Sequence, residues 1–193
     1  NKMRGVATMR TQAKAPYRLG TQRLVLRPYS IADAPELRKK INSKEVSRYT
    51  LNIPHPYEEG MAEDFILHTL TQFYENKNFT YALVGKDTGE LMGSAGIAPL
   101  WRHNKAEIGY WLAEEFWNQG YMTEAVQALI HMGFTALGLN RIFADFLEPN
   151  HGSRRVMEKA GMVLESMTRQ KYKLGEEYLD AGTCAILKED YFR

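Results

Sequence analysis

The sequence predicts an α/β (α+β) fold in which a mostly antiparallel sheet of about six or seven strands is flanked by helices. Short segments rich in branched and aromatic side chains recur along the chain and indicate strands. One segment with clear helical periodicity, residues 122–137, lies between two of these strands. A strand, a helix and a strand in succession place two neighbouring strands parallel, with the helix crossing over one face.

The first part of the chain predicts one strand and two helices. Residues 23–27 alternate apolar and charged side chains, as a strand with one buried face does. A helix is expected over residues 33–42, with Asp33 as its N-cap. A second helix is expected over residues 57–76, after the break at Pro54-His55-Pro56.

The central strands follow these helices. Residues 80–84 and 91–97 flank a turn at residues 87–89 and are typical of a β-hairpin. Residues 106–112 form a further strand, which leads into a loop at Gly120.

The helix over residues 122–137 has the clearest periodicity in the chain, and Gly138 supplies a left-handed turn that can end it. The remaining expected elements are a strand at residues 141–147, a helix at 152–160 closed by Gly161, and strands at 162–169 and 179–187.

Composition indicates one globular domain. The 193 residues are 44% hydrophobic and 25% charged, a balance that can bury a core. The net charge of +2 is scattered along the chain, so it predicts no specific nucleic acid as a partner. We expect a single domain over residues 21–193 behind a basic extension over residues 1–20, for which a ribosome or RNA contact stays open.

Cysteine content and hydropathy indicate the cellular compartment of the protein. Cys184 is the only cysteine, which excludes an intrachain disulfide and fits a reducing cytosol. No apolar run approaches the roughly 18 residues of a membrane span, and the first residues lack the apolar stretch of a secretory signal. We therefore expect a cytoplasmic protein without membrane contact.

The loop that precedes the long helix has the chemistry of an anion site. Backbone N–H groups of residues 118–120 have no expected partner, and Gly120 lets a ligand approach the backbone closely. The positive end of the helix dipole favours a phosphate there. A plain turn before a helix is the alternative, and Glu124 in the first helical turn disfavours a phosphate unless it points away.

Three motifs occur in a fixed order: AEIGYWL at residues 106–112, GYMTEA at 120–125 and NHGSRRVMEKAG at 150–161. With their spacing, the block over residues 107–161 resembles the GNAT superfamily, in particular the branch of ribosomal-protein-alanine N-acetyltransferases. The segment TQRLVLRP at residues 21–28 looks like the first strand of that family. The resemblance therefore implies a GNAT-like fold over most of the chain.

The resemblance also implies acetyl-coenzyme A (acetyl-CoA) as cosubstrate. Trp111, Leu112 and Ala113 would pair with the pantetheine arm as a pseudo-strand. The family usually carries Arg or Gln at the position of Trp117, and Gly or Ala at the position of Met122. Backbone N–H groups make most of the phosphate contacts in such a loop, so a pyrophosphate site is still expected here despite the different side chains. The N–H groups expected around the pyrophosphate are those of Asn118, Gln119, Gly120, Tyr121, Met122 and Thr123.

Asn150 and Ser153 form a second candidate site at the start of the helix over residues 152–160. In the similar family the matching Asn contacts the cofactor or orders the loop. The matching Ser lies near the thiol, where it can protonate the departing CoA thiolate, and this makes Ser153 the candidate acid. Helix capping is the alternative that the residue types alone support.

Glu107 is the candidate general base, because the acceptor amine must lose a proton before it attacks the thioester. A cross-strand ion pair with a Lys or Arg is the alternative for this residue. Some similar proteins carry a carboxylate, proposed as the base, at the position of Tyr172. Because this chain has a tyrosine there, a carboxylate base cannot be assigned to that position. The histidines show no spacing that suits a metal or a triad, and no metal site is expected.

The resulting hypothesis is direct transfer of an acetyl group from acetyl-CoA to a primary amine, without a covalent acyl-enzyme. The expected acceptor is the N-terminal α-amine of a protein, with a ribosomal protein as the example that the resemblance implies. A small amine such as a polyamine, amino acid or antibiotic is the enzymatic alternative, and a non-catalytic acyl-CoA-binding module is the third. Monomer and homodimer both remain open.

Overall fold

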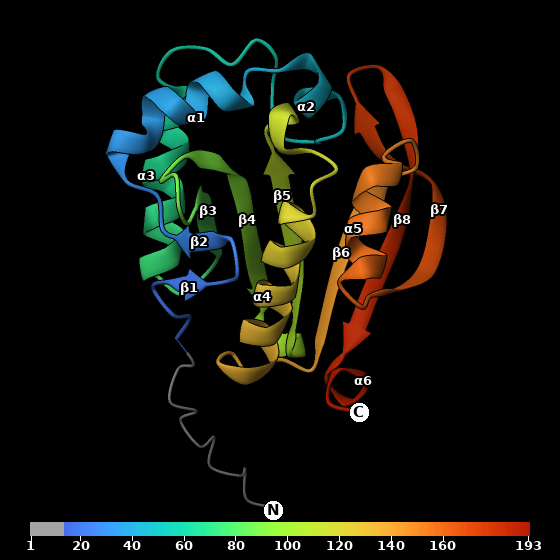
Figure 1. The fold of residues 1–193 in the computed structure, drawn as a ribbon. Helices are drawn as coiled ribbons and strands as arrows, with labels where there is room; N and C mark the ends of the chain where they lie inside the picture. Colours follow the sequence, from blue (N-terminus) through green and yellow to red (C-terminus); the bar gives the residue numbers. More distant parts are fainter. Residues whose placement is uncertain (1–13) are drawn as a thin grey trace, which may run out of the picture.

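The structure, a computed structural model, describes residues 14–193, in which helices flank a central β-sheet (Figure 1). Its strands are β1 (Leu19–Gly20), β2 (Leu24–Arg27), β3 (Phe79–Gly85), β4 (Leu91–Leu100), β5 (Lys105–Leu112), β6 (Arg141–Leu147), β7 (Val163–Leu174) and β8 (Glu177–Leu187). Its α-helices are α1 (Ala34–Ile41), α2 (Lys44–Arg48), α3 (Met61–Tyr74), α4 (Tyr121–Thr135), α5 (His151–Lys159) and α6 (Lys188–Tyr191), and its short 3-10 helices are η1 (Ile31–Asp33), η2 (Trp101–His103) and η3 (Glu114–Phe116).

The strands described here form one sheet in the order β1-β2-β3-β4-β5-β6-β8-β7. Only β5 and β6 run parallel, which confirms the predicted mostly antiparallel sheet and its single crossover. The sheet has one strand more than the upper expectation, because Leu19–Gly20 pairs with β2. This short strand lies within the predicted basic extension, whose residues 1–13 are outside the described part of the chain.

The α-helices match the expected order with three changes: α3 begins later, and the short helices α2 and α6 were not predicted. The second predicted helix begins only at Met61, because Gly60 has a left-handed backbone with φ of +86°. Tyr57 instead lies in the preceding loop, where it is buried and its N–H donates to Asn42 Oδ1 at 3.0 Å. The five-residue α2 was not predicted, because a helix that short shows no repeating apolar face.

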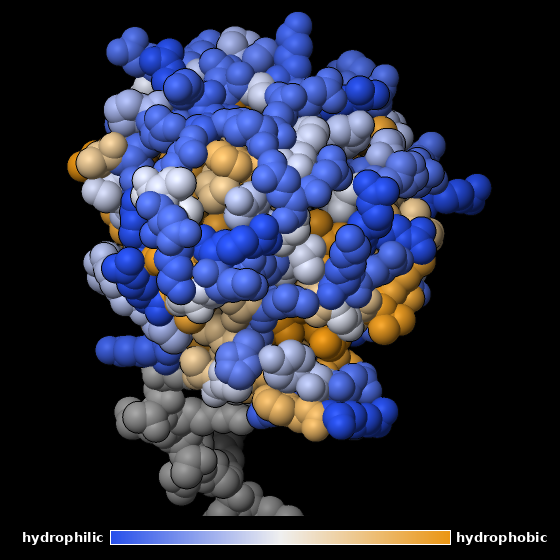
Figure 2. Space-filling view, in the orientation of Figure 1, coloured by the Kyte–Doolittle hydropathy of each residue, from blue (hydrophilic) through white to orange (hydrophobic). Residues whose placement is uncertain are grey.

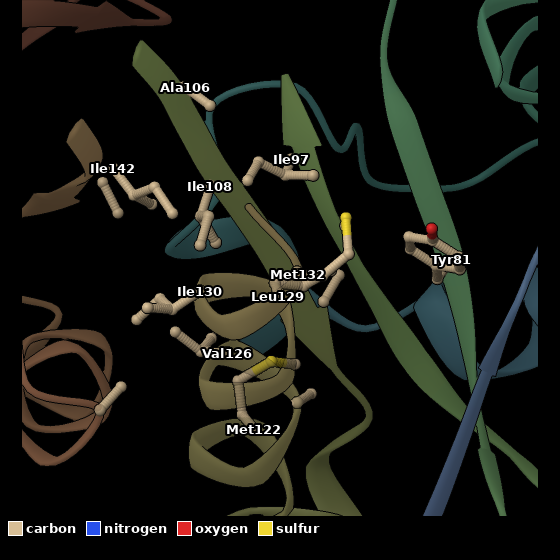
Figure 3. Packing of buried hydrophobic residues seen from close by; sticks show 14 of the residues in the cluster. Tyr81, Ile97, Ala106, Ile108, Met122, Val126, Leu129, Ile130, Met132 and Ile142 are labelled. Atoms are coloured by element: carbon tan, nitrogen blue, oxygen red, sulfur yellow. The ribbon is translucent and has the colours of Figure 1, made fainter. Parts of the chain in front are cut away.

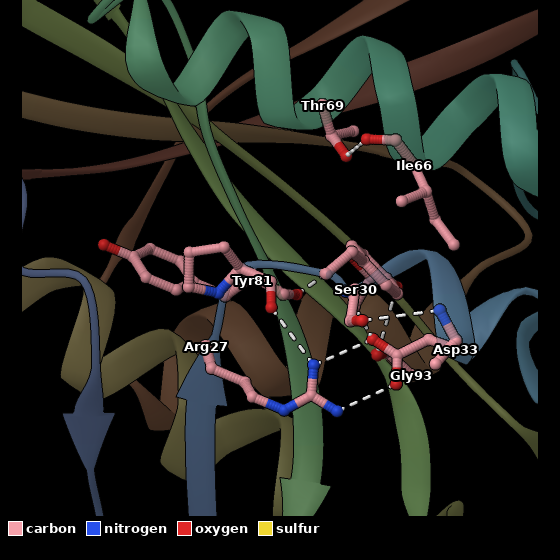
Figure 4. A network of polar contacts seen from close by, with 11 residues as sticks. Arg27, Ser30, Asp33, Ile66, Thr69, Tyr81 and Gly93 are labelled. Atoms are coloured by element: carbon pink, nitrogen blue, oxygen red, sulfur yellow. Dashed lines mark hydrogen bonds and ion pairs between the residues drawn. The ribbon is translucent and has the colours of Figure 1, made fainter.

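Ser30 caps η1, which leads directly into α1, and the expected side-chain cap of α1 by Asp33 is wrong (Figure 4). Ser30 Oγ accepts from the N–H of Ala32 at 3.3 Å. The Asp33 carboxylate accepts from the N–H of Ser30 at 2.7 Å and from both Nη atoms of Arg27 at 2.8 Å. Two charge-assisted bonds from one guanidinium are stronger than the single bond of a side-chain cap, so the carboxylate turns back toward β2.

Helix α4 supplies the main core on one face of the sheet (Figure 3). Gly133 belongs to its buried side, where a Cβ would lie 2.6 Å from Ile142 Cδ1 and 3.0 Å from Ile97 Cδ1. The missing side chain lets the helix approach the sheet closely. The buried residues of α4 shown there are Met122, Val126, Leu129, Ile130 and Met132, and they face Tyr81, Ile97, Ala106, Ile108 and Ile142 of β3 to β6.

Helices α1 and α3 cover the opposite face with a second buried cluster. Side chains of a strand point alternately to the two faces. Along β5, Ile108 and Leu112 therefore join the α4 core, whereas Trp111 joins the cluster of α1 and α3. The strand thus carries two sets of side chains into two different environments.

Strands β5 and β6 pair over only three positions, from Lys105 with Arg141 to Glu107 with Phe143. Beyond Glu107, no described strand pairs with β5 on this side as far as Leu112, and none pairs with the facing edge of β6 as far as Leu147. The sheet therefore splits at its centre, and the backbone edges along this split are free to bind a ligand.

The last two strands extend further than expected. Strand β7 reaches Leu174 and β8 begins at Glu177, so the two strands form a long hairpin. Gln170 has φ of +50°, and the register shifts between Thr168 and Tyr172. This bulge bends the hairpin and brings the side chains of Lys171 and Tyr172 over the sheet face near β6.

Hydrophilic residues cover most of the surface on the side shown in Figure 2, and hydrophobic residues appear toward its lower right. Exposed apolar side chains of the described residues include Val163 and Met167 of β7 and Phe192 after α6. Within residues 14–193 no helix has the length and apolar character needed to cross a bilayer.

Replacing Leu129 by Ala tests the contribution of the α4 core. The side chain is fully buried, so Leu129→Ala should lower the free energy of unfolding by about 2–5 kcal/mol. Leu67→Ala on α3 is the matched control, since Leu67 is 55% exposed and the change should cost no more than about 1 kcal/mol. Urea unfolding measures both, and equal losses would contradict this account of the core.

Candidate active site

The loop between β5 and α4 leaves a row of free backbone donors. None of the N–H groups of residues 118–123 donates to a residue in the described part of the chain, whereas the N–H of Glu124 bonds Gly120 O at 3.1 Å. Asn118 and Gly120 have φ of +60° and +83°, which turns the chain sharply into the helix. These free N–H groups, together with the start of α4, suit a phosphate.

The two departures from the family loop are explained by packing. Trp117 turns inward, where its indole N–H donates to Leu112 O at 2.7 Å. Met122 is 5% exposed and belongs to the α4 core. Neither side chain covers the free N–H groups, so both residues fill the interior and leave the loop backbone available.

Lys40 of α1 braces the segment before this loop. Its ammonium lies 2.5 Å from Glu115 Oε1 and 2.7 Å from Glu90 Oε1, and its side chain is only 7% exposed. Gln119 donates its side-chain N–H to Glu115 O at 2.7 Å, which links the brace to the loop. Helix α1, the β3–β4 turn and the loop are therefore tied together.

The three residues expected to pair with pantetheine lie at the end of β5. Trp111 and Leu112 are buried, and their side chains enter the two different cores. Ala113 already uses both backbone groups, because its N–H donates to Met92 O and its carbonyl accepts from Phe116. Leu112 O likewise accepts from the Trp117 indole, so the free strand edge along the split is that of residues 108–111.

Asn150 and Ser153 lie together at the start of α5. Asn150 Oδ1 accepts from the N–H of Ser153 at 3.0 Å, so Asn150 caps the helix. The Ser153 hydroxyl lies 2.8 Å from the hydroxyl of Tyr110, which reaches across from β5. Burial raises the pKa of the Tyr110 phenol, although the bond to Ser153 opposes this, so the phenol stays protonated. A pair of hydroxyls thus bridges the split.

Glu107 is on the other face of β5, at the last position paired with β6. It forms no ion pair with any described residue, so the expected alternative of a cross-strand ion pair is absent from that part of the chain. The residue is exposed, yet neighbouring groups partly desolvate its carboxylate, and this raises its pKa. The charge of Asp145 adds to the rise, whereas Lys171 opposes it.

Asp145 of β6 holds a polar network beside Glu107. Its carboxylate accepts from Tyr172 Oη at 2.5 Å and Thr183 Oγ1 at 2.6 Å, and it lies 2.6 Å from Lys171 Nζ. Burial alone would raise the pKa of Asp145, but the bonds from Lys171, Thr183 and Tyr172 lower it. Tyr172 is therefore a hydrogen-bond donor in this network and does not act as the base that some similar proteins carry at its position.

Sequence reasoning missed Tyr110 and Asp145 as members of the site. Side chains alternate along β5, so the sequence indicates that Tyr110 lies on the face opposite to Glu107 and Trp111. Its partner Ser153 could not be found in this way, because it is 43 positions further along the chain. Asp145 lies in an apolar strand, and a lone acidic residue there was a usable signal. No group of three or more metal-ligating side chains occurs among residues 14–193.

Comparisons with known proteins identify the family. The profile of the Acetyltransferase (GNAT) domain matches residues 23–163. The uncharacterized N-acetyltransferase p20 of Bacillus licheniformis is 32% identical over 174 residues, which cover 90% of this chain and 97% of that protein. The putative ribosomal N-acetyltransferase YdaF of Bacillus subtilis is 28% identical over 173 residues, covering 88% and 94%.

Solved structures share the fold along most of the chain. A GNAT-family acetyltransferase from Bacillus anthracis superimposes with a TM-score of 0.81 at 26% identity, covering 89% of this chain and 99% of that one. The ribosomal L7/L12 alpha-N-protein acetyltransferase RimL, solved with coenzyme A, has a TM-score of 0.80 at 20% identity, covering 90% and 97%.

The match to YdaF supports the resemblance to the ribosomal-protein acetyltransferase branch. Acetyl-CoA is the acetyl donor that GNAT acetyltransferases use. A loop rich in free N–H groups, followed by a split between two parallel strands, fits that donor. The chain belongs to the GNAT acetyltransferase family and is an N-acetyltransferase.

Proposed function

We propose that this enzyme transfers the acetyl group of acetyl-CoA directly to the N-terminal α-amine of a protein, with a ribosomal protein as the natural acceptor. The observation that carries the proposal is the split between β5 and β6, which has a hydroxyl pair on one face and Glu107 on the other. The names of YdaF and RimL support the choice of a ribosomal acceptor. Such an acceptor implies a cytoplasmic enzyme.

The donor would lie along the split, with its pyrophosphate at the free N–H groups of residues 118–123. The free edge at residues 108–111 offers backbone groups to the pantetheine arm. A strand amide near Trp111 would meet the oxyanion that forms on the thioester carbonyl. This arrangement directs the thioester toward Ser153 and Tyr110, which meet across the split.

Transfer needs two proton movements. The acceptor nitrogen attacks the thioester carbon, and Glu107 takes the proton that the amine must lose. The carbon–sulfur bond then breaks, and the Ser153 hydroxyl, bonded to Tyr110, donates a hydrogen bond or a proton to the departing thiolate. The raised pKa of Glu107 brings its basicity closer to that of the amine it serves.

A small amine is the alternative acceptor. The acidic residues considered for binding such a cation, Glu58, Glu59, Glu63 and Asp64, are all exposed at the start of α3 or just before it. A solvated surface explains them without a ligand. No feature of the described residues favours this acceptor, and it remains an outcome of the test below.

An acceptor panel tests the proposed function. With acetyl-CoA as donor, thiol release should be fastest with peptides that copy ribosomal protein N-termini, because a free α-amine next to a peptide bond is the predicted acceptor. The same peptides with a blocked N-terminus are the control and should be inert. Faster turnover of polyamines, amino acids or antibiotics would overturn the protein acceptor, and no thiol release with any amine would overturn the enzyme's proposed reaction.

Glu107→Gln should lower kcat/KM by about 10²–10⁴-fold, the range of a lost general base.

In the unchanged enzyme, the acid limb of kcat/KM against pH should lie above the ordinary pKa of Glu, because partial burial and Asp145 raise the pKa of Glu107. Lys171→Met should move that limb to higher pH, since it removes a charge that favours the carboxylate, and Asp145→Asn should move it lower.

The matched control for these profiles is Glu176→Gln, at the tip of the β7–β8 hairpin, where the side chain is 97% exposed. It should leave rate and pH dependence unchanged. If Glu107→Gln keeps the rate of the unchanged enzyme, Glu107 is not the base.

Ser153→Ala and Tyr110→Phe test the hydroxyl pair. Each should slow single-turnover acetyl transfer by about 2- to 10-fold, the contribution of one neutral hydrogen bond. The double variant should be no slower than the slower single variant, because both changes remove one shared interaction. Tyr178→Phe is the control on an exposed strand residue. Fully additive losses would show that the two hydroxyls act separately.

A further inference from the structure

Arg23, directly before β2, makes a set of contacts with the loop at residues 118–120 and the start of α4. Its Nε lies 2.8 Å from Glu124 Oε2, and its Nη1 donates to Gln119 O at 3.0 Å. The guanidinium carbon lies 4.2 Å from the centre of the Tyr121 ring. The Arg23 side chain therefore contacts the loop at Gln119 O and the first turn of α4 at Glu124 and at the Tyr121 ring.

Glu124 is the acidic residue that the sequence places close to the expected phosphate. Its Oε1 accepts from Thr21 Oγ1 at 2.5 Å and from the N–H of Arg23 at 2.6 Å. Burial alone would raise the pKa of Glu124, but the bonds from Thr21 and Arg23 lower it, so the carboxylate stays ionised. The adjacent guanidinium offsets that charge, which would otherwise repel an anion at the helix start.

The guanidinium also lies against the backbone of Gly120. A Cβ on Gly120 would be 3.3 Å from Arg23 Nη2. Nη2 donates no hydrogen bond to any described residue, and the side chain is 40% exposed. Two of the three guanidinium nitrogens thus bind the protein, and the third lies beside the loop with its N–H groups unused.

We propose that Arg23 is a positioning residue for the pyrophosphate of the acetyl donor. By holding Gln119 O and Glu124, it fixes the direction of the free N–H groups of residues 118–123, and it supplies positive charge where the loop side chain Trp117 supplies none. The inference rests on the proposed binding of the donor at this loop.

The test compares Arg23→Met with the unchanged enzyme on three thioester donors: acetyl-CoA, acetyl-3′-dephospho-CoA and S-acetylpantetheine, which has no pyrophosphate. Arg23→Met should raise KM about tenfold or more for the first two donors with little change in kcat, as expected for a lost charged hydrogen bond. For S-acetylpantetheine, kcat/KM should change by less than about threefold, because Arg23 then has no phosphate to position.

Two controls separate this role from general stability. Arg27→Met removes a partly exposed guanidinium that is also bound to a carboxylate, four positions along the same segment. It should leave the KM values for all three donors unchanged. Arg23→Lys keeps the charge without the planar fork, so its KM for acetyl-CoA should lie between those of the unchanged enzyme and Arg23→Met.

Equal losses of kcat/KM for all three donors in Arg23→Met would assign Arg23 a structural role and overturn the inference. An effect confined to acetyl-CoA would overturn it as well, since it would assign Arg23 to the 3′-phosphate. Both results leave the proposed acetyl transfer intact. Failure of the unchanged enzyme to release thiol from any donor would instead count against the proposed function.

Discussion

The loss of pairing between β5 and β6 after Glu107 is the constraint on which the site depends. Each strand keeps its other neighbour, because β5 stays in register with β4 to Leu112 and β6 stays with β8 to Leu147. The split is therefore held open from both sides by complete ladders. Since side chains alternate across a strand, Tyr110 and Glu107 reach opposite faces of it.

The loop at the end of the split is held by cations that come from distant segments. Lys40 of α1 binds Glu115 ahead of the loop, and Arg23 binds Glu124 behind it. Both carboxylates would oppose an anion if they were unpaired. Their pairing leaves the backbone N–H groups as the main electrostatic feature of the loop, while Trp117 and Met122 pack inward.

Much of the fold was predictable because periodicity is a local property. The hairpin of β3 and β4, the long helix α4 and the strands on either side of it follow from alternation or helical spacing. The sequence did not predict α2, which is too short to show a period, or β1, whose two residues form a strand only because β2 lies beside them. The Asp33 cap failed because Arg27 binds that carboxylate.

The site divides in the same way. The sequence by itself determined the motif order and the glycine before α4, and it predicted free backbone donors at residues 118–120, because the first turn of a helix offers its N–H groups no partner within the helix. Only the tertiary structure decided that Tyr110 meets Ser153, that Asp145 stands beside Glu107 and that Arg23 reaches Glu124. These contacts join residues far apart in the chain, and their geometry depends on the packing of whole strands and helices.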